Sequence, residues 1–428
     1  MKHARGYLVV FLCGAVLAGS ARAQTTQRRI RLVYATPVTQ AQIWEAGEAT
    51  VIRRFMEANP DIEVVARQIA FESYDTQVLL SVRGGTGPDV ARVNTPTLRM
   101  WAGAGYLQPL DEFISRSDVI QPADYWEGLW NFCRIDGKQW AVPLGTDCRV
   151  LFYHFGLFRE AGLTGPPATW DELVAAAQRI QDKPRKRYGL AMPTNNEWNA
   201  AYDALGNFLV ANGGHILNEQ GTRSTAGEDP AAREAFQFLC DLITRHDVCP
   251  PGMASMSGEV VDSLFVQGRL GMLMGGPYER GNLERLNPNF QWNVHYGTAV
   301  IPAGPATGRS GSAQGGWLVA AFAQSRHPQE ALRLLEFFQR PESLAIIAAV
   351  ENLPPRRAAM NLGPFSDPFY KVFFDQLPTA RPPFPSVPQA PNVARAVQRA
   401  YQRVVAGGAT ADEAIAWLDN KLTHHFLR

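Results

Sequence analysis

Residues that could carry catalysis are present in this chain, but none of them completes a catalytic motif. The stretch Gly308-Arg309-Ser310-Gly311-Ser312 approaches the nucleophile turn of serine hydrolases, which needs glycine where this chain has its last serine. The glycine-rich turn at residues 84–88 lacks the Lys-Ser/Thr ending of a phosphate-binding loop. Carboxylates are numerous enough that a glycosidase pair stays open. The residue types therefore indicate binding rather than chemistry, with no cofactor expected.

Four of the five cysteines lie after residue 23, at short spacings. In an oxidising compartment an even count favours disulfides, and nearest neighbours would pair Cys133 with Cys148 and Cys240 with Cys249. Four cysteines allow three pairings, and free buried thiols are the alternative. A metal site is not expected, because closely paired ligands of the C-x-x-C kind are missing from the sequence.

The first 23 residues have the pattern of an export signal. Lys2, His3 and Arg5 precede an apolar core at residues 7–18, and Ala21-Arg22-Ala23 forms a small-x-small cleavage site. The core is shorter than the roughly 20 apolar residues that span a bilayer. We therefore expect cleavage after residue 23 and a periplasmic protein.

A lipid-anchored form is the alternative at this end of the chain, because Cys13 could be a lipidation site. Cys13 lies inside the apolar core and follows the bulky Leu12 rather than a small residue. The free form is therefore favoured.

Length and charge limit the classes of protein to which the mature chain can belong. The chain has 428 residues, and losing the signal lowers the basic residues from 41 to 38, against 40 acidic ones. Such a near-neutral balance argues against nucleic-acid binding. A chain this long exceeds what one hydrophobic core usually organises, so two lobes are expected.

Apolar periodicity predicts an α/β fold. Strands are expected at residues 30–34, 62–69 and 89–93, with helices at 42–57 and 73–82 between them. Alternating strands and helices build parallel sheets with right-handed crossovers. Further along, Thr169 and Glu172 predict a capping box that begins a helix, and more helices are expected at 197–211, 230–246, 260–267 and 328–339.

Several ordered strings resemble one protein family over nearly the whole mature chain. They are Asn59-Pro60-Asp61, Pro88-Asp89-Val90, Gly105-Tyr106-Leu107, Trp140-Ala141-Val142-Pro143, Leu151-Phe152-Tyr153, residues 157–163, Thr169-Trp170-Asp171-Glu172-Leu173, Phe265 to Met272, Gly275-Gly276-Pro277-Tyr278 and Gly315-Gly316-Trp317. This order resembles the family 1 extracellular solute-binding proteins, the sugar-type receptors of bacterial ABC importers. Two departures are Tyr278, where the family usually has tryptophan, and His154, where it usually has asparagine after the tyrosine.

The resemblance implies two lobes joined by about three crossings, near residues 150, 293 and 345. Lobe one is expected to hold residues 24–150 and 294–345. Lobe two is expected to hold residues 151–293 and 346–428.

Eight residues are expected to contact the ligand. Sugars stack their C–H faces on aromatic rings and pair their hydroxyls with planar polar groups. Ligands of open α/β sheets bind beyond the carboxyl ends of strands and between domains, and paired glycines let the backbone approach closely. The candidates are Trp44, Asn94, Asp147, Trp198, Tyr278, Gly316, Trp317 and Arg356. Each aromatic among them could instead be core, and Asp147 could instead pair with Arg149 or another arginine.

The resemblance thus implies a non-catalytic, periplasmic receptor for a carbohydrate or related polyol. It would act as a monomer, bind no nucleic acid or metal, and deliver its solute to ABC permease subunits in the inner membrane. Two other functions stay open: a secreted polysaccharide-active enzyme, which would turn over its substrate, and a solute sensor for a membrane kinase, which would bind identically.

Overall fold

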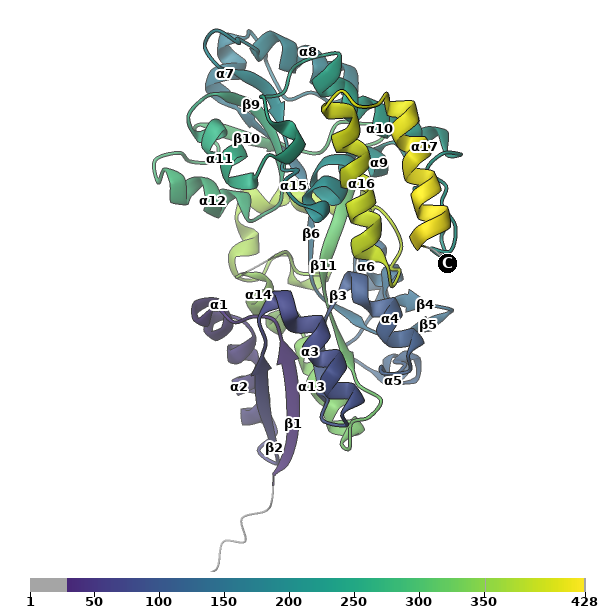
Figure 1. Cartoon of the computed structure of the whole chain (residues 1–428). Coiled ribbons are helices and arrows are strands. Elements are labelled where there is room, and N and C mark those ends of the chain that lie inside the picture. The colour runs from purple at the N-terminus through teal and green to yellow at the C-terminus, as the bar shows by residue number, and fades with distance from the viewer. Residues whose placement is uncertain (1–28, 351, 427–428) are drawn as a thin grey trace, which may run out of the picture.

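The computed structural model describes residues 29–350 and 352–426, so the predicted signal peptide at residues 1–23 lies outside the described residues. Figure 1 shows two groups of elements, one above the other, with the strands β6 (Val142–Cys148) and β11 (Ser312–Ala321) extending between them. Each group is built around its own sheet of strands. The mixed α/β class predicted from the sequence is confirmed.

The sheet of the first group has six strands in the order β12-β11-β3-β1-β2, with β6 also paired to β11. Strands β1, β2 and β3 are parallel, as helical crossovers require, whereas β11 runs antiparallel to both β3 and β6. The three strands predicted in the first hundred residues are confirmed. Their bounds and that of the edge strand are β1 (Ile30–Thr36), β2 (Ile62–Gln68), β3 (Val90–Asn94) and β12 (Ala380–Arg381).

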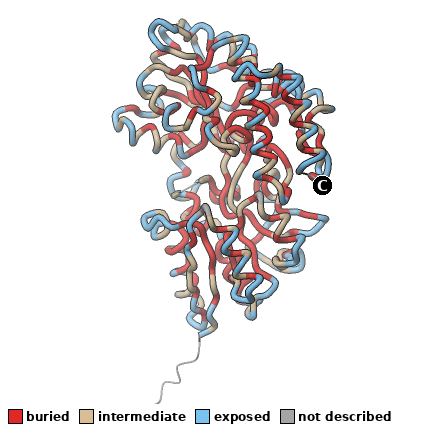
Figure 2. Tube along the Cα trace, viewed as in Figure 1, coloured by how far each residue is buried: buried red, intermediate tan, exposed pale blue. Residues whose placement is uncertain are grey.

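Helices cover both faces of this sheet and give it two cores. One core joins the sheet to α2, α13 and α14, and the other joins it to α3, α4 and α6. Figure 2 shows the buried chain concentrated along the strands. The helices of this group are α1 (Ala41–Ala46), α2 (Glu48–Ala58), α3 (Phe71–Arg83), α4 (Leu98–Gly103), α5 (Asp111–Arg116), α6 (Glu127–Phe132), α13 (Pro328–Phe338) and α14 (Pro341–Ala348).

The single helix predicted at residues 42–57 is in fact two helices that break at Gly47. The backbone of Gly47 adopts φ −100° and ψ −107°, outside the helical region. A Cβ atom at this position would lie 2.9 Å from Cγ2 of Val350. Close approach of the C-terminal end of α14 thus explains the glycine and the break, and periodicity alone does not reveal either.

The sheet of the second group has four strands in the order β10-β7-β9-β8. Strand β7 runs antiparallel to β10 and β9, and β8 runs parallel to β9. The strands are β7 (Val150–His154), β8 (Tyr188–Ala191), β9 (Leu270–Gly275) and β10 (Tyr296–Ala299). A separate hairpin pairs β4 (Arg134–Ile135) with β5 (Lys138–Gln139).

One large core holds this second group together, with helices from the middle and the end of the chain packed on it. The predicted start of α8 is confirmed, since the Thr169 hydroxyl accepts a hydrogen bond from the Glu172 amide. The Glu172 carboxylate, however, accepts from the Ala168 amide and not from Thr169, so the capping box is incomplete. None of the helices in the described residues is long and apolar enough to cross a membrane. The helices are α7 (Phe155–Glu160), α8 (Trp170–Ile180), α9 (Asn207–Ala211), α10 (Pro230–Thr244), α11 (Gly258–Val266), α12 (Glu279–Leu286), α15 (Lys371–Gln376), α16 (Ala390–Val405) and α17 (Ala411–Lys421).

The predicted helix at residues 197–211 has an unusual first half. Residues Asn199–Gly206 form a π-helix, and only Asn207–Ala211 continue as α-helix α9. Its i→i+5 hydrogen bonds widen the turn, so residues four apart, such as Asn199 and Asp203, come near the same side. Such segments occur frequently at functional sites.

The predicted disulfides are wrong, because all four described cysteines are free and buried. Cys133 packs in a core of the first group, whereas Cys148 packs in the core of the second. Cys240 lies on the buried side of α10 and Cys249 on the loop that follows. Each thiol behaves as a small apolar side chain, which an even count of cysteines cannot reveal.

Candidate functional site

Arg149 is the single residue between β6 of the first sheet and β7 of the second sheet. The backbone at this crossing is held by Ser312 at the start of β11. The amide of Arg149 donates to the Ser312 hydroxyl at 2.8 Å, and that hydroxyl donates to the carbonyl of Arg149 at 2.9 Å. One side chain therefore satisfies both backbone groups where the chain leaves one sheet for the other.

The guanidinium of Arg149 joins two carboxylates that come from different parts of the fold. Its Nε donates to Asp203 Oδ1 at 2.6 Å, and its Nη1 donates to Asp147 Oδ1 at 2.7 Å. Asp147 belongs to β6 and also accepts the Gly315 amide at 2.8 Å, whereas Asp203 belongs to the π-helix. Burial raises the pKa of Asp203, and the charge of Arg149 offsets part of that shift. Arg149 thus links the two groups of elements through buried, charge-assisted bonds.

A concavity of about 330 Å³ opens beside this ion cluster, and we call it the crossing pocket. Its walls come from the carboxyl end of β3 and the middle of β11 on one side and from the π-helix on the other. It is lined by Asn94, Thr95, Arg149, Trp198, Asn199, Tyr202, Asp203, Gly315, Gly316 and Trp317. Four of the eight candidates from the sequence therefore meet in one place.

Trp317 stands in the wall that β11 provides. Between Trp317 and Leu318 the pairing with β6 shifts register, as at a β-bulge. Gly316 has φ +150°, and a Cβ atom there would lie 2.4 Å from the carbonyl oxygen of Gly145. Glycine is thus required for the close approach of the two strands, whatever its part in binding.

A buried ion pair packs against the indole ring of Trp317. The Arg92 guanidinium lies 4.4 Å from the ring centroid and is itself 3.0 Å from the Glu48 carboxylate. Arg92 and Glu48 are almost fully buried. A cation against an indole face is attracted to it, so this pair helps to set the ring's position.

The opposite wall carries the second indole. Trp198 precedes the π-helix and meets Tyr202 edge to face, with 5.9 Å between ring centroids. Tyr202 in turn meets Phe384 at 5.8 Å. Trp198 and Trp317 are both half-buried, which leaves aromatic surface to each wall of the pocket.

The remaining four candidates do not line the crossing pocket. Asp147 forms an ion pair with Arg149. This pairing is the alternative to ligand contact that the sequence analysis left open. Tyr278 is 40% exposed, and the charges of Asp203 and Arg149 affect the pKa of its hydroxyl. Tyr278 therefore lies near the ion cluster without lining the crossing pocket. Trp44 packs against the core of the first sheet.

Arg356 lies farther away and is engaged in structure. It is buried, ion-paired to Asp124 at 2.7 Å, and donates to the carbonyl oxygen of Gln339 at 2.5 Å. Its guanidinium also faces the ring of Tyr125 at 5.3 Å. The structure does not bring this arginine to the other candidates.

Sequence reasoning missed several lining residues, chiefly Arg149, Asn199, Tyr202 and Asp203. The last three come from the π-helix, whose widened turn has no recognisable sequence pattern. Arg149 was expected only as a partner for Asp147. Its position as the one residue between two strands of different sheets was the signal that could have found it.

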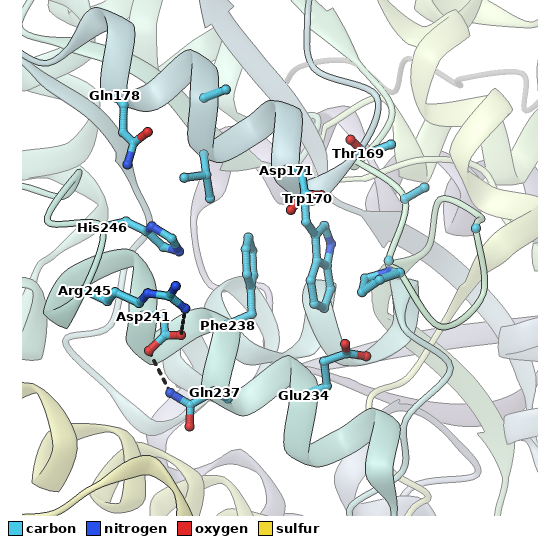
Figure 3. Close-up of a pocket in the computed structure, with 16 residues that line it drawn as sticks. Thr169, Trp170, Asp171, Gln178, Glu234, Gln237, Phe238, Asp241, Arg245 and His246 are labelled. Carbon is cyan, nitrogen blue, oxygen red and sulfur yellow. Dashed lines mark hydrogen bonds and ion pairs between the residues drawn. The ribbon is translucent and has the colours of Figure 1, made fainter.

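A larger concavity, of about 780 Å³, lies elsewhere on the second group (Figure 3). It is formed by α8, α10 and the loop at residues 303–308, and Phe238 stacks on Trp170 there with 4.3 Å between centroids. We call it the flank pocket. It holds none of the eight candidates and only elements packed on the second sheet. We therefore take the crossing pocket as the candidate ligand site although it is smaller, because two walls, two indoles and an ion cluster meet there.

Comparison with known proteins agrees with this architecture. The chain belongs to the bacterial extracellular solute-binding protein family, which matches residues 36–345. A Brucella abortus protein whose name describes a binding protein is 29% identical over 293 residues, or 68% of each chain. A Thermotoga lettingae ABC transporter solute-binding protein, solved with α-D-tagatose, shares 25% identity and a TM-score of 0.73 over 93% of this chain and 100% of that one.

The structure of the sugar-binding protein MalE from Xanthomonas citri superposes with a TM-score of 0.81, covering 93% of this chain and 97% of that one at 24% identity. This likeness confirms the two-lobed binding-protein fold that the sequence resemblance predicted. The family is one of solute-binding proteins outside the cytoplasm.

Proposed function

We propose that this protein is the periplasmic substrate-binding protein of an ABC importer and captures a carbohydrate or related polyol in the crossing pocket. The observation that carries the proposal is the juxtaposition of Trp198 and Trp317 with amides, hydroxyls and an ion pair where the two sheets join. Stacking faces and planar hydrogen-bonding groups are the two features that sugars need. Membership of the solute-binding family and the tagatose bound by the Thermotoga lettingae protein support the same ligand class.

We propose further that the two sheets mark two lobes that close on the ligand. The boundary predicted from the sequence, between residues 293 and 294, is moved: lobe one would comprise residues 24–150 and 300–345, and lobe two residues 151–299 and 346–428, since β10 (Tyr296–Ala299) belongs to the second sheet. Because β10 pairs with β7 and β11 pairs with β6, we place the second crossing after Ala299 and before Ser312. The protein would act as a monomer, be exported by its signal peptide, and present the closed form to the permease.

The experiment is a thermal-shift screen of mono- and oligosaccharides, polyols, amino acids and organic acids against the mature protein. A carbohydrate or polyol should raise the melting temperature, since a ligand that binds only the folded state stabilises it by mass action. Calorimetry should then give one ligand per chain, and NMR of the solute after long incubation should show it unchanged. Saturable binding of another solute class alone, or turnover by pure protein, would contradict the proposal.

A further inference from the structure

The ion cluster at the crossing pocket contains more carboxylates than cations. Among the described residues that line it, Arg149 and Asp203 are the only charged ones. Asp147 lies directly behind and takes a second bond from the same guanidinium. Two carboxylates therefore share one cation at this end of the pocket.

The nearby arginines do not change this balance, because each already has a partner. Arg92 lies beneath Trp317 and is paired with Glu48 at 3.0 Å. Arg99 donates to the carbonyl oxygen of Ser386 at 2.8 Å and lies 3.7 Å from the Asp136 carboxylate. Neither arginine lines the pocket.

An anionic ligand would meet an unfavourable environment here. Proteins recognise carboxylates and phosphates through guanidinium donors in a bidentate arrangement. Arg149 has already given Nε and Nη1 to carboxylates. A third negative charge would also be repelled at short range in a partly buried site, where electrostatic interactions are stronger than in water.

Ligand hydroxyl groups, by contrast, would meet a favourable environment in the crossing pocket. Asp203 uses Oδ1 for Arg149, and its Oδ2 has no hydrogen bond among the described residues, so that oxygen can accept from a ligand hydroxyl. Asn94, Asn199 and Tyr202 add neutral donors and acceptors around it.

We infer that the Asp147–Arg149–Asp203 cluster makes the crossing pocket selective for uncharged polyhydroxylated ligands and excludes their carboxylate and phosphate derivatives. This inference rests on the proposed function and narrows it. Asp203 would be the specificity-determining residue that contacts the ligand, and Asp147 a positioning residue that acts through Arg149.

The test compares ligands in which one CH2OH group is replaced by a carboxylate while the ring form is kept: D-glucose with D-glucuronate, D-mannitol with D-mannonate, and maltitol with maltobionate. Dissociation constants are measured by calorimetry at pH 7.5 and low salt. For any pair with a neutral member that binds, the acid should bind about tenfold more weakly or worse, the scale by which like charges suppress a wrong partner. An acid that binds as tightly as its neutral partner overturns this inference and leaves the proposed function standing. Binding of amino acids or peptides alone would overturn both.

Two variants sharpen the result. Asp203→Asn removes one negative charge, so the ratio of acid to neutral affinity should rise by about tenfold. A general loss of affinity cancels in that ratio. Asp147→Asn, at a residue outside the lining, should move the same ratio in the same direction and is available if Asp203→Asn does not fold. An unchanged ratio in a folded variant would contradict the role assigned to the cluster.

Discussion

The guanidinium of Arg149 donates to the carboxylate of Asp203 at 2.6 Å, across the point where the chain passes from one sheet to the other. Side chains of both partners are about 10% exposed or less. A buried pair of this kind is costly to break, because the remaining charge is left without a partner. The bond therefore connects the stability of the crossing with the shape of the pocket beside it.

Replacing Arg149 with methionine should be strongly destabilising. The variant leaves Asp147 and Asp203 buried without their cation, and loss of one partner of a buried pair costs about 3–5 kcal/mol. Urea unfolding should show this loss, and the double variant Arg149→Met/Asp203→Asn should recover part of it. As a control, Arg116→Met breaks the exposed pair with Glu112 and should cost less than about 1 kcal/mol. Equal effects of the two single variants would mean that the cluster is not a structural link.

The two indoles of the crossing pocket should contribute directly to affinity. Trp198→Ala and Trp317→Ala should each weaken binding by roughly 1–3 kcal/mol, the scale of burying a large apolar side chain. That is about 5- to 150-fold in dissociation constant. Trp44→Ala is the matched control, because Trp44 packs against a core and does not line the pocket. Calorimetry on folded protein should show affinity unchanged in the control; the reverse pattern would place the site elsewhere.

A buried pair of carboxyls should make the stability of the second group depend on pH. Asp262 in α11 and Glu279 at the start of α12 are nearly inaccessible, and burial raises the pKa of Asp262 to about 6 and that of Glu279 also upward. The folded state then binds more protons than the unfolded state above pH 4. The contribution of this pair to stability is therefore complete below about pH 4 and is lost as pH rises through 6.

Urea titrations at pH 4.5 and pH 7.5 measure this effect. For Asp262 alone, a shift of about two pKa units corresponds to roughly 3 kcal/mol over its full titration. Asp262→Asn should flatten the dependence, while Asp118→Asn, at an exposed position, should leave it as in the native protein. An Asp262→Asn variant with the same pH dependence as the native protein would show that the pair is ionised without cost.

All four cysteines of the mature chain should be reduced thiols. Labelling under denaturing, non-reducing conditions should modify four groups per chain. In the native protein the reaction should be slow at pH 8, because burial raises the pKa of Cys133 and Cys148 and so disfavours the reactive thiolate. Fewer than four labelled thiols after denaturation would restore the disulfides predicted from the count.

The sequence predicts most of the fold but only part of the candidate site. The strand–helix alternation before residue 95 follows from apolar spacing, and the ordered strings around Trp140 and Trp170 carry enough information to indicate the family. Asn94, Trp198, Gly316 and Trp317 were found because strand ends and paired glycines have a local pattern.

The rest of the site depends on tertiary arrangement. The π-helix that presents Tyr202 and Asp203 has an ordinary helical spacing of apolar residues, so the widened turn could not be read from it. Arg356 and Trp44 have suitable chemistry, but burial in ion-pair and apolar contacts engages them elsewhere. Free thiols and disulfides likewise give the same cysteine count.

The most direct test of the account is a crystal structure with the sugar or polyol that gives the largest thermal shift. We predict ligand density in the crossing pocket, stacked on Trp198 or Trp317 and within hydrogen-bond distance of Asp203. Ligand density in the flank pocket instead, with the crossing pocket empty, would contradict the central claim.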